Sequence, residues 1–103
     1  MKVAQKSIGW TDPNAGSGVQ NFLIFYAQGN PSFSYDLPSV AIPAVPGQTD
    51  YVYALPGAIP LTEGEWTLWI APADAEGNIA DPVSVTRPFD FTPPQPVTNL
   101  RVF

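Results

Sequence analysis

The stretch that decides the fold is VQNFLIFYAQ, residues 19–28 of the chain. Its side chains fall on two faces of an extended backbone: Phe22, Ile24 and Tyr26 on one face, Leu23 and Phe25 on the other. Alternation with a period of two is typical of a β-strand that has a different environment on each side. We therefore predict a strand here and place the face of Phe22 toward the core.

A second stretch, EWTLWIAPA at residues 65–73, alternates in the same way and predicts another strand. Trp66, Leu68 and Ile70 lie on its inward face, and Trp69 lies on the opposite face. Turn residues separate these stretches from their neighbours, as in DAEGN at 74–78. Further strands are expected at residues 3–10, 33–37, 50–55 and 79–90.

The composition favours short strands over helices. Thirteen prolines and eight glycines are spread over 103 residues, and proline inside a helix costs about 3 kcal/mol. Apolar residues make up 45% and aromatic residues 13% of the chain, enough for one core in one domain. Short strands separated by turn signals predict an all-β fold, namely a two-sheet antiparallel β-sandwich.

The charge and the missing residue types exclude several functions. Nine Asp and Glu against four Lys and Arg give a net charge of −5, which disfavours binding to nucleic acid or to an anionic membrane. The apolar run at 22–27 is too short to span a bilayer, and Met1 is followed by no signal-peptide core. The chain has no Cys or His, so disulfides, the usual zinc and haem sites and His-dependent triads are excluded.

The acidic residues do not suggest catalysis. Glu63 and Glu65 form a close pair of carboxylates, and they lie before a strand, where solvated charges are ordinary. The sequence contains no nucleophile elbow or phosphate-binding glycine loop. We expect no enzymatic activity and no cofactor.

Three stretches resemble the fibronectin type III family. IGWTDP at 8–13 is similar to its second strand, and GVQNFLIFYA at 18–27 is similar to its third strand. LTEGEWTLWIAPADAEGNIADP at 61–82 is similar to its leucine-led corner, its sixth strand and the turn that follows. Trp66 stands where the family usually has a corner tyrosine, and Pro72 replaces a small core residue. The resemblance implies a fibronectin type III or immunoglobulin-like sandwich over residues 1–91.

The same resemblance implies a non-catalytic structural or protein-interaction module. Such a module would be a spacer or docking domain in a larger surface, secreted or phage structural assembly, in contact with neighbouring domains or with a second copy. An extracellular, cell-surface or virion location follows from the resemblance alone.

The C-terminal segment, residues 92–103, combines a proline-rich linker with a strand-like tail. It resembles the start of a following domain, whereas the nine residues before Trp10 are too few for the family's first strand and the second. One explanation is a boundary that cuts a tandem array. The other is that the tail completes an open sheet, in its own chain or in a neighbour, through Val97, Leu100 and Val102.

The outward faces of the two clearest strands predict a contact surface. Leu23, Phe25 and Trp69 would form an apolar patch, which Tyr35 or Phe33 could extend, and exposed apolar patches usually mark contacts with a partner. The alternative is that the proline-rich middle segment folds over the patch and buries it.

Two ligand hypotheses accompany this patch. The aromatic side chains could stack on sugar rings in a carbohydrate-binding accessory module, with Gln20, Asn21 and Thr67 as polar neighbours. Calcium could bind the oxygen-rich turn at Asp74, Glu76, Asn78 and Asp81, because Ca²⁺ prefers oxygen ligands. The turn itself needs no metal, and its spacing does not follow the EF-hand rule.

Overall fold

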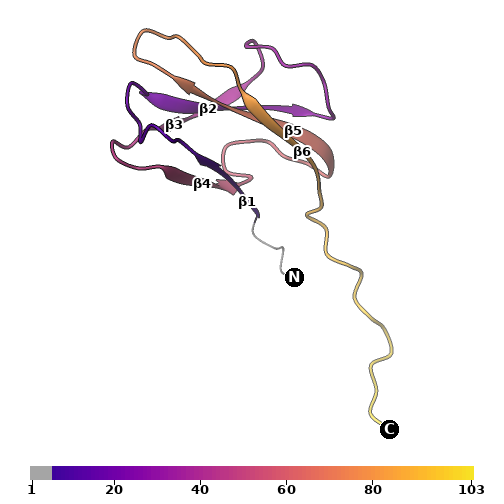
Figure 1. The fold of residues 1–103 in the computed structure, drawn as a ribbon. Helices are drawn as coiled ribbons and strands as arrows, with labels where there is room; N and C mark the ends of the chain where they lie inside the picture. Colours follow the sequence, from indigo (N-terminus) through magenta and orange to yellow (C-terminus); the bar gives the residue numbers. More distant parts are fainter. Residues whose placement is uncertain (1–5) are drawn as a thin grey trace.

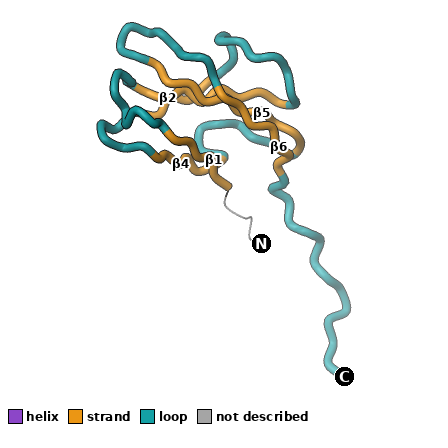
Figure 2. The backbone as a smooth tube through the Cα atoms, viewed as in Figure 1, coloured by secondary structure: helices purple, strands orange, loops and turns teal. Residues whose placement is uncertain are grey.

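In a computed structural model that describes residues 6–103, the chain forms two antiparallel sheets stacked as layers (Figure 1). The described residues contain strands, turns and loops but no helix (Figure 2). The smaller sheet pairs β1 (Lys6–Thr11) with β4 (Asp50–Leu55). The larger sheet has the order β3-β2-β5-β6, with β3 at Ser39–Pro43, β2 at Asn21–Gln28, β5 at Gly64–Ala73 and β6 at Val83–Phe89.

The prediction of an all-β chain with two antiparallel sheets is confirmed. The predicted strands at 19–28, 50–55 and 65–73 match β2, β4 and β5 closely. β1 lies within the predicted 3–10 apart from its last residue, although residues 3–5 lie outside the described part. The last strand is shorter than predicted and begins at Val83, directly after Pro82.

The predicted strand at 33–37 is wrong. Ser34 forms a turn there, because its hydroxyl accepts a hydrogen bond from the Asp36 N–H and its carbonyl accepts one from the Leu37 N–H. Serine offers the backbone this local alternative to a sheet ladder. The strand that does lie in this region, β3, follows Pro38 and was missed.

The core lies between the sheets. Phe22 and Ile24 of β2 and Leu68 and Ile70 of β5 are buried in it, together with Tyr51, Leu55 and Ile59. The Trp10 ring of β1 stacks on Tyr51 at 5.6 Å and lies 5.7 Å from Phe22. The expectation that the Phe22 face turns inward is therefore confirmed, and it places Trp10 and Phe22 in contact between the layers.

Trp66 is buried as well, but it lies outside this ring cluster, at the corner that leads into β5. Its indole N–H donates a hydrogen bond of 3.1 Å to the Thr62 carbonyl, four residues upstream. The side chain thus ties the corner to the strand that follows it.

A buried carboxylate organises the opposite end of the sandwich. Asp12 follows β1 and accepts hydrogen bonds from the Asn14 and Gly16 N–H groups, at 3.0 and 2.7 Å. Gly16 has a φ of 80°, a conformation that glycine adopts without strain. This end of the groove described below is therefore held by an ordered loop.

Candidate interaction surfaces

The outer face of the large sheet carries the patch that the sequence predicts, but this patch is covered. Phe25 and Trp69 are only 2% and 5% exposed, and with Ala71 they form a second apolar cluster. They are register partners on β2 and β5, so their side chains lie side by side. The side chains do point away from the intersheet core, as expected, but the expectation of an exposed patch is wrong for both residues.

The cover is the segment between β2 and β3. Phe33 packs edge-on against Phe25 at 5.1 Å and lies 5.5 Å from Trp69. Leu37 and the half-buried Leu23 belong to the same cluster. The alternative in which the proline-rich middle segment folds over the patch is therefore the one that the structure favours.

Tyr35 is the one predicted contact residue on this face that stays on the surface, at 48% exposed. Its ring meets Phe33 edge-on at 4.8 Å, and its hydroxyl donates a hydrogen bond to the Ala80 carbonyl at 3.3 Å. The ring is thus held by the cover and the hydroxyl by the loop between β5 and β6, and Tyr35 offers a single exposed ring for stacking.

One of the three polar neighbours expected for a sugar, Thr67, already has hydrogen-bond partners within the protein. Thr67 is buried, donates a hydrogen bond to the Gly29 carbonyl at 2.7 Å, and lies 2.8 Å from the Thr86 hydroxyl. This side chain therefore cannot face a ligand on the surface. No feature of this face favours carbohydrate over protein.

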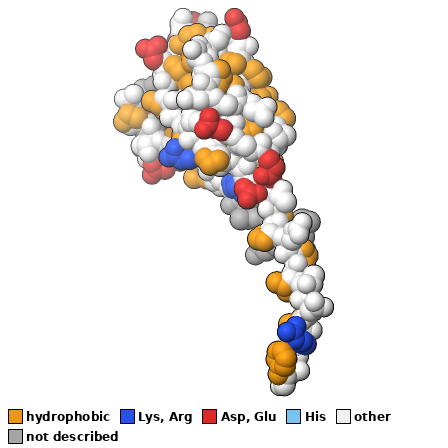
Figure 3. All heavy atoms as spheres, turned by 90° about the vertical axis from the view of Figure 1, so that its right-hand side faces the viewer, with side chains coloured by type: hydrophobic (Ala, Val, Ile, Leu, Met, Phe, Trp, Pro, Cys, Tyr) orange, Lys and Arg blue, Asp and Glu red, His pale blue; other side chains and the backbone are white. Residues whose placement is uncertain are grey.

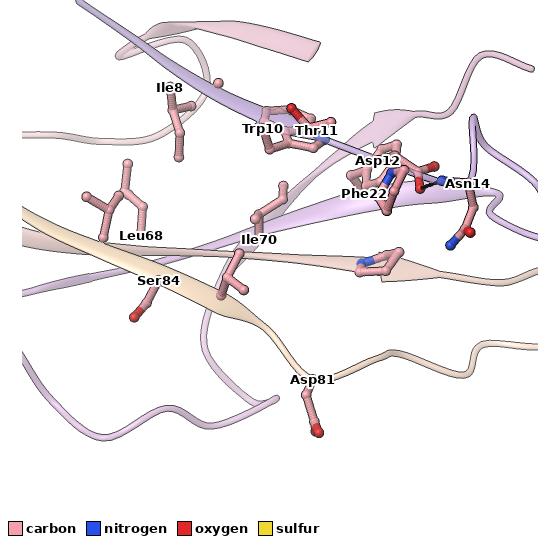
Figure 4. A pocket seen from close by; sticks show the side chains of 15 residues that line it. Ile8, Trp10, Thr11, Asp12, Asn14, Phe22, Leu68, Ile70, Asp81 and Ser84 are labelled. Carbon is pink, nitrogen blue, oxygen red and sulfur yellow. Dashed lines mark hydrogen bonds between the residues drawn. The ribbon is translucent and has the colours of Figure 1, made fainter. Parts of the chain in front are cut away.

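A second apolar surface lies on the other side of the molecule, in a groove between β1 and the β5–β6 side of the large sheet. Two adjoining hollows of about 460 and 540 Å³ share Ile8, Leu68 and Val85 in their walls. In Figure 4, Ile8 points from one layer toward Leu68 and Ile70 of the other. The groove thus reaches the core residues themselves.

The rim of this groove is a sheet edge. Among the described strands, β4 is the only neighbour of β1, and β5 is the only neighbour of β6. Among the described residues, β6 and residues 7–11 of β1 therefore have a neighbouring strand on one side only, and open strand edges are templates for a further strand. The buried indole N–H of Trp10, beside the groove, has no hydrogen-bond acceptor in the described part of the chain. An open sheet is one of the two expectations from the sequence, whereas the hollows beside its edge are not predicted there.

The tail that follows β6 leaves the body and stays extended (Figures 1 and 3). The strand-completion candidates Val97, Leu100 and Val102 are at least 85% exposed. The described chain measures 68 × 31 × 18 Å, with a radius of gyration of 17.7 Å, whereas a compact domain of 100 residues has about 13 Å. The tail thus pairs with none of the six described strands of its own chain.

The exit of the tail is held in place. Glu63 accepts hydrogen bonds from the Phe91 N–H and the Thr92 hydroxyl, at 2.6 and 2.9 Å. The Lys6 ammonium donates to the Asp90 carbonyl at 2.8 Å and lies 4.7 Å from the centre of the Phe91 ring. We call these five residues the exit collar. Glu63, one of the two paired carboxylates of the sequence, therefore positions the tail.

The acidic turn after β5 is closed by its own hydrogen bonds. The Asp74 carboxylate accepts from the Glu76 and Asn78 N–H groups and from the Asn78 amide, at 2.8 to 3.1 Å. These hydrogen bonds, that of the Asn78 side chain first, lower the pKa of Asp74 below its usual value. Within residues 6–103, no three acidic side chains lie together as metal ligands would.

The comparisons with known proteins add no relative: no family model matches the chain, and no curated protein matches it. Residues 6–103 include no helix long and apolar enough to cross a membrane.

Proposed function

We propose that this protein is a fibronectin type III-like β-sandwich that acts as a non-catalytic docking module, holding a protein neighbour within a larger assembly. The observation that carries the proposal is the apolar groove beside the unpaired edge of β1. An apolar wall next to unpaired backbone groups suits an extended protein segment, because the backbone can add to the ladder while side chains enter the hollows.

Two further features support the family part of this proposal. β2 and β5, which resemble the third and sixth strands of the family, are paired in register along their length. The Trp66–Thr62 hydrogen bond closes the corner in the manner of a corner tyrosine, whose hydroxyl bonds to backbone a few residues upstream. A surface, secreted or phage structural setting follows from the resemblance and is part of the proposal.

The walls of the groove agree with docking rather than catalysis. Its carboxylates are Asp12, whose two oxygens accept hydrogen bonds from the following loop, and Asp81 at the rim. Most of the other lining side chains are apolar. Burial of apolar surface is the main favourable term in protein association.

NMR titration tests the proposal. The isotope-labelled protein is titrated with an unlabelled copy and, separately, with a panel of soluble polysaccharides. We expect the unlabelled protein to shift resonances on at least one face, with those of Ile8, Trp10 and Val85 foremost, and the polysaccharides to shift none. A response to a polysaccharide around Tyr35, with no response to protein, would overturn the proposal.

A further inference from the structure

We infer that the groove between β1 and β6 accepts the C-terminal tail of a second copy of this chain, which adds to the edge of β1 as an antiparallel strand. This inference rests on the proposed docking function and names its partner. Four observations carry it: the fit of the tail to the groove, its length, the direction in which the exit collar sends it, and its charge.

The side chains of the tail fit the groove. In an extended strand Leu100 and Val102 lie on one face with Thr98, and the other face carries Val97, Asn99, Arg101 and Phe103. Leu100 and Val102 would enter the two hollows beside Ile8 and Val85. The other face, with Asn99 and Arg101 between Val97 and Phe103, would lie outward. In the free chain this apolar face is open to solvent, with Leu100 at 91% and Val102 at 99% exposed.

The length of the tail also fits. β1 has six residues and spans about 20 Å at the usual rise of an antiparallel strand. The seven residues 97–103 span about 24 Å at the same rise and therefore cover the whole edge. Every strand pair in the described sheets is antiparallel, and antiparallel pairing is slightly more stable per residue than parallel pairing.

The exit collar directs the tail away from its own groove. An antiparallel partner of β1 must begin beside Thr11, whereas the collar holds Thr92 beside Lys6, at the other end of β1. Val97 lies five residues after Thr92 and reaches at most about 18 Å from it in a fully extended chain, which is about the length of β1. To enter its own groove in this direction, the tail would have to run fully extended along β1 and then turn back, whereas it leaves the body with Val97, Leu100 and Val102 exposed. A second copy is therefore the donor that we infer.

The charges agree with this partner. Residues 1–91 contain nine carboxylates and three cations, whereas the tail contains one cation, Arg101, and no acidic side chain. Two bodies repel each other, but the tail of one copy is not repelled by the body of the next. Because donor and acceptor surfaces are different parts of the chain, two copies can exchange tails in a closed dimer, or copies can add head-to-tail into longer species.

Sedimentation velocity of the full chain over a range of concentrations tests the inference. We expect dimers and longer species to grow with concentration. L100S should weaken this association about tenfold or more, because it removes a large buried apolar side chain. N99S, which changes the neighbouring residue on the solvent face, is the matched control and should leave association unchanged.

The acceptor side has its own pair of variants. Val83 lines the groove and Val52 lies on the outer side of the small sheet, and both are exposed. V83K should weaken association as L100S does, while V52K should not. A synthetic peptide of residues 93–103, added to the labelled L100S chain, should shift the resonances of Ile8 and Val85.

Three results would overturn the inference. One is association that L100S and V83K leave unchanged, which would keep the docking function but move it to another surface. Another is a monomeric chain whose tail amides are protected from hydrogen exchange, which would mean that the tail folds onto its own body. The third is a chain that stays monomeric and shows no response to the peptide or to the unlabelled protein, which would also remove the proposed function.

Discussion

Two apolar surfaces of the molecule differ in their cover: among residues 6–103, a segment of the chain closes only one of them. The outer face of the large sheet carries Phe25 and Trp69, and Phe33 from the following segment covers both. The groove beside β1 carries Ile8 and Val85, and no described segment lies over it.

The difference shows what an alternating sequence does and does not reveal. Both surfaces consist of the same kinds of side chain, so composition cannot distinguish them. The two surfaces differ in the segments that could cover them. The ten residues between β2 and β3 can fold over the outer face, whereas the exit collar directs the tail after β6 away from the groove. The groove, which no described segment covers, is therefore the better candidate for contact with a partner than the covered outer face.

The largest expected effect is on the covered surface. Trp69→Ala should lower the free energy of unfolding by about 3–5 kcal/mol, because Trp69 is as buried as a core residue. Urea denaturation measures this change. Tyr35→Ala, on the exposed side of the cover, is the comparison and should cost much less. A Trp69→Ala protein as stable as the unmodified chain would mean that the cover does not exist.

The matching change at the groove should cost slightly less. Trp10 is only partly buried, so Trp10→Ala should destabilise the fold by about 3 kcal/mol, the lower end of the range for such truncations. Trp10→Phe keeps most of the ring contacts and removes the indole N–H that has no acceptor in the described structure. An unpaired buried donor costs about 1–3 kcal/mol, so the phenylalanine variant should lose little stability. Equal losses for both variants would contradict this account of Trp10.

Removing the cover should turn the closed surface into an open one. Phe33→Ala should lower stability by about 1–3 kcal/mol, as typical single substitutions do, and should raise the binding of a hydrophobic dye. The half-buried Ile8 of the groove offers a control, because Ile8→Val should leave dye binding near that of the unmodified protein. Unchanged dye binding in Phe33→Ala would show that other residues hold the cover in place.

The smallest expected effect lies at the turn after β5, away from both surfaces. Its hydrogen bonds lower the pKa of Asp74 in the folded state. The stability that the charged carboxylate contributes is therefore present above the pKa of the unfolded chain and is lost as the pH falls through the folded value. NMR titration of the carboxyl group should show that Asn78→Ala raises the pKa of Asp74, whereas Gln48→Ala leaves it unchanged. An unchanged value in Asn78→Ala would remove the assigned cause.

The sequence predicts the core better than the surfaces, for physical reasons. The alternation of Phe22, Ile24, Leu68 and Ile70 reports a strand face directly, because its period depends on the backbone alone. The burial of Phe25 and Trp69 depends on how the segment between β2 and β3 packs back on the sheet. The turn at Ser34 shapes this segment, although the residues at 33–37 read as a strand in the sequence. The groove follows from strand order, which local patterns do not contain.

Amide hydrogen exchange of the full chain, measured in dilute and in concentrated solution, tests the contrast between the two surfaces most directly. We expect the amides of β2 and β5 near Phe25 and Trp69 to be protected in both samples. Those on the unpaired side of β1 should exchange quickly in the dilute sample and slow down in the concentrated one. If the β1 amides are as protected as those of β2 in dilute solution, the groove is already filled and the central claim is wrong.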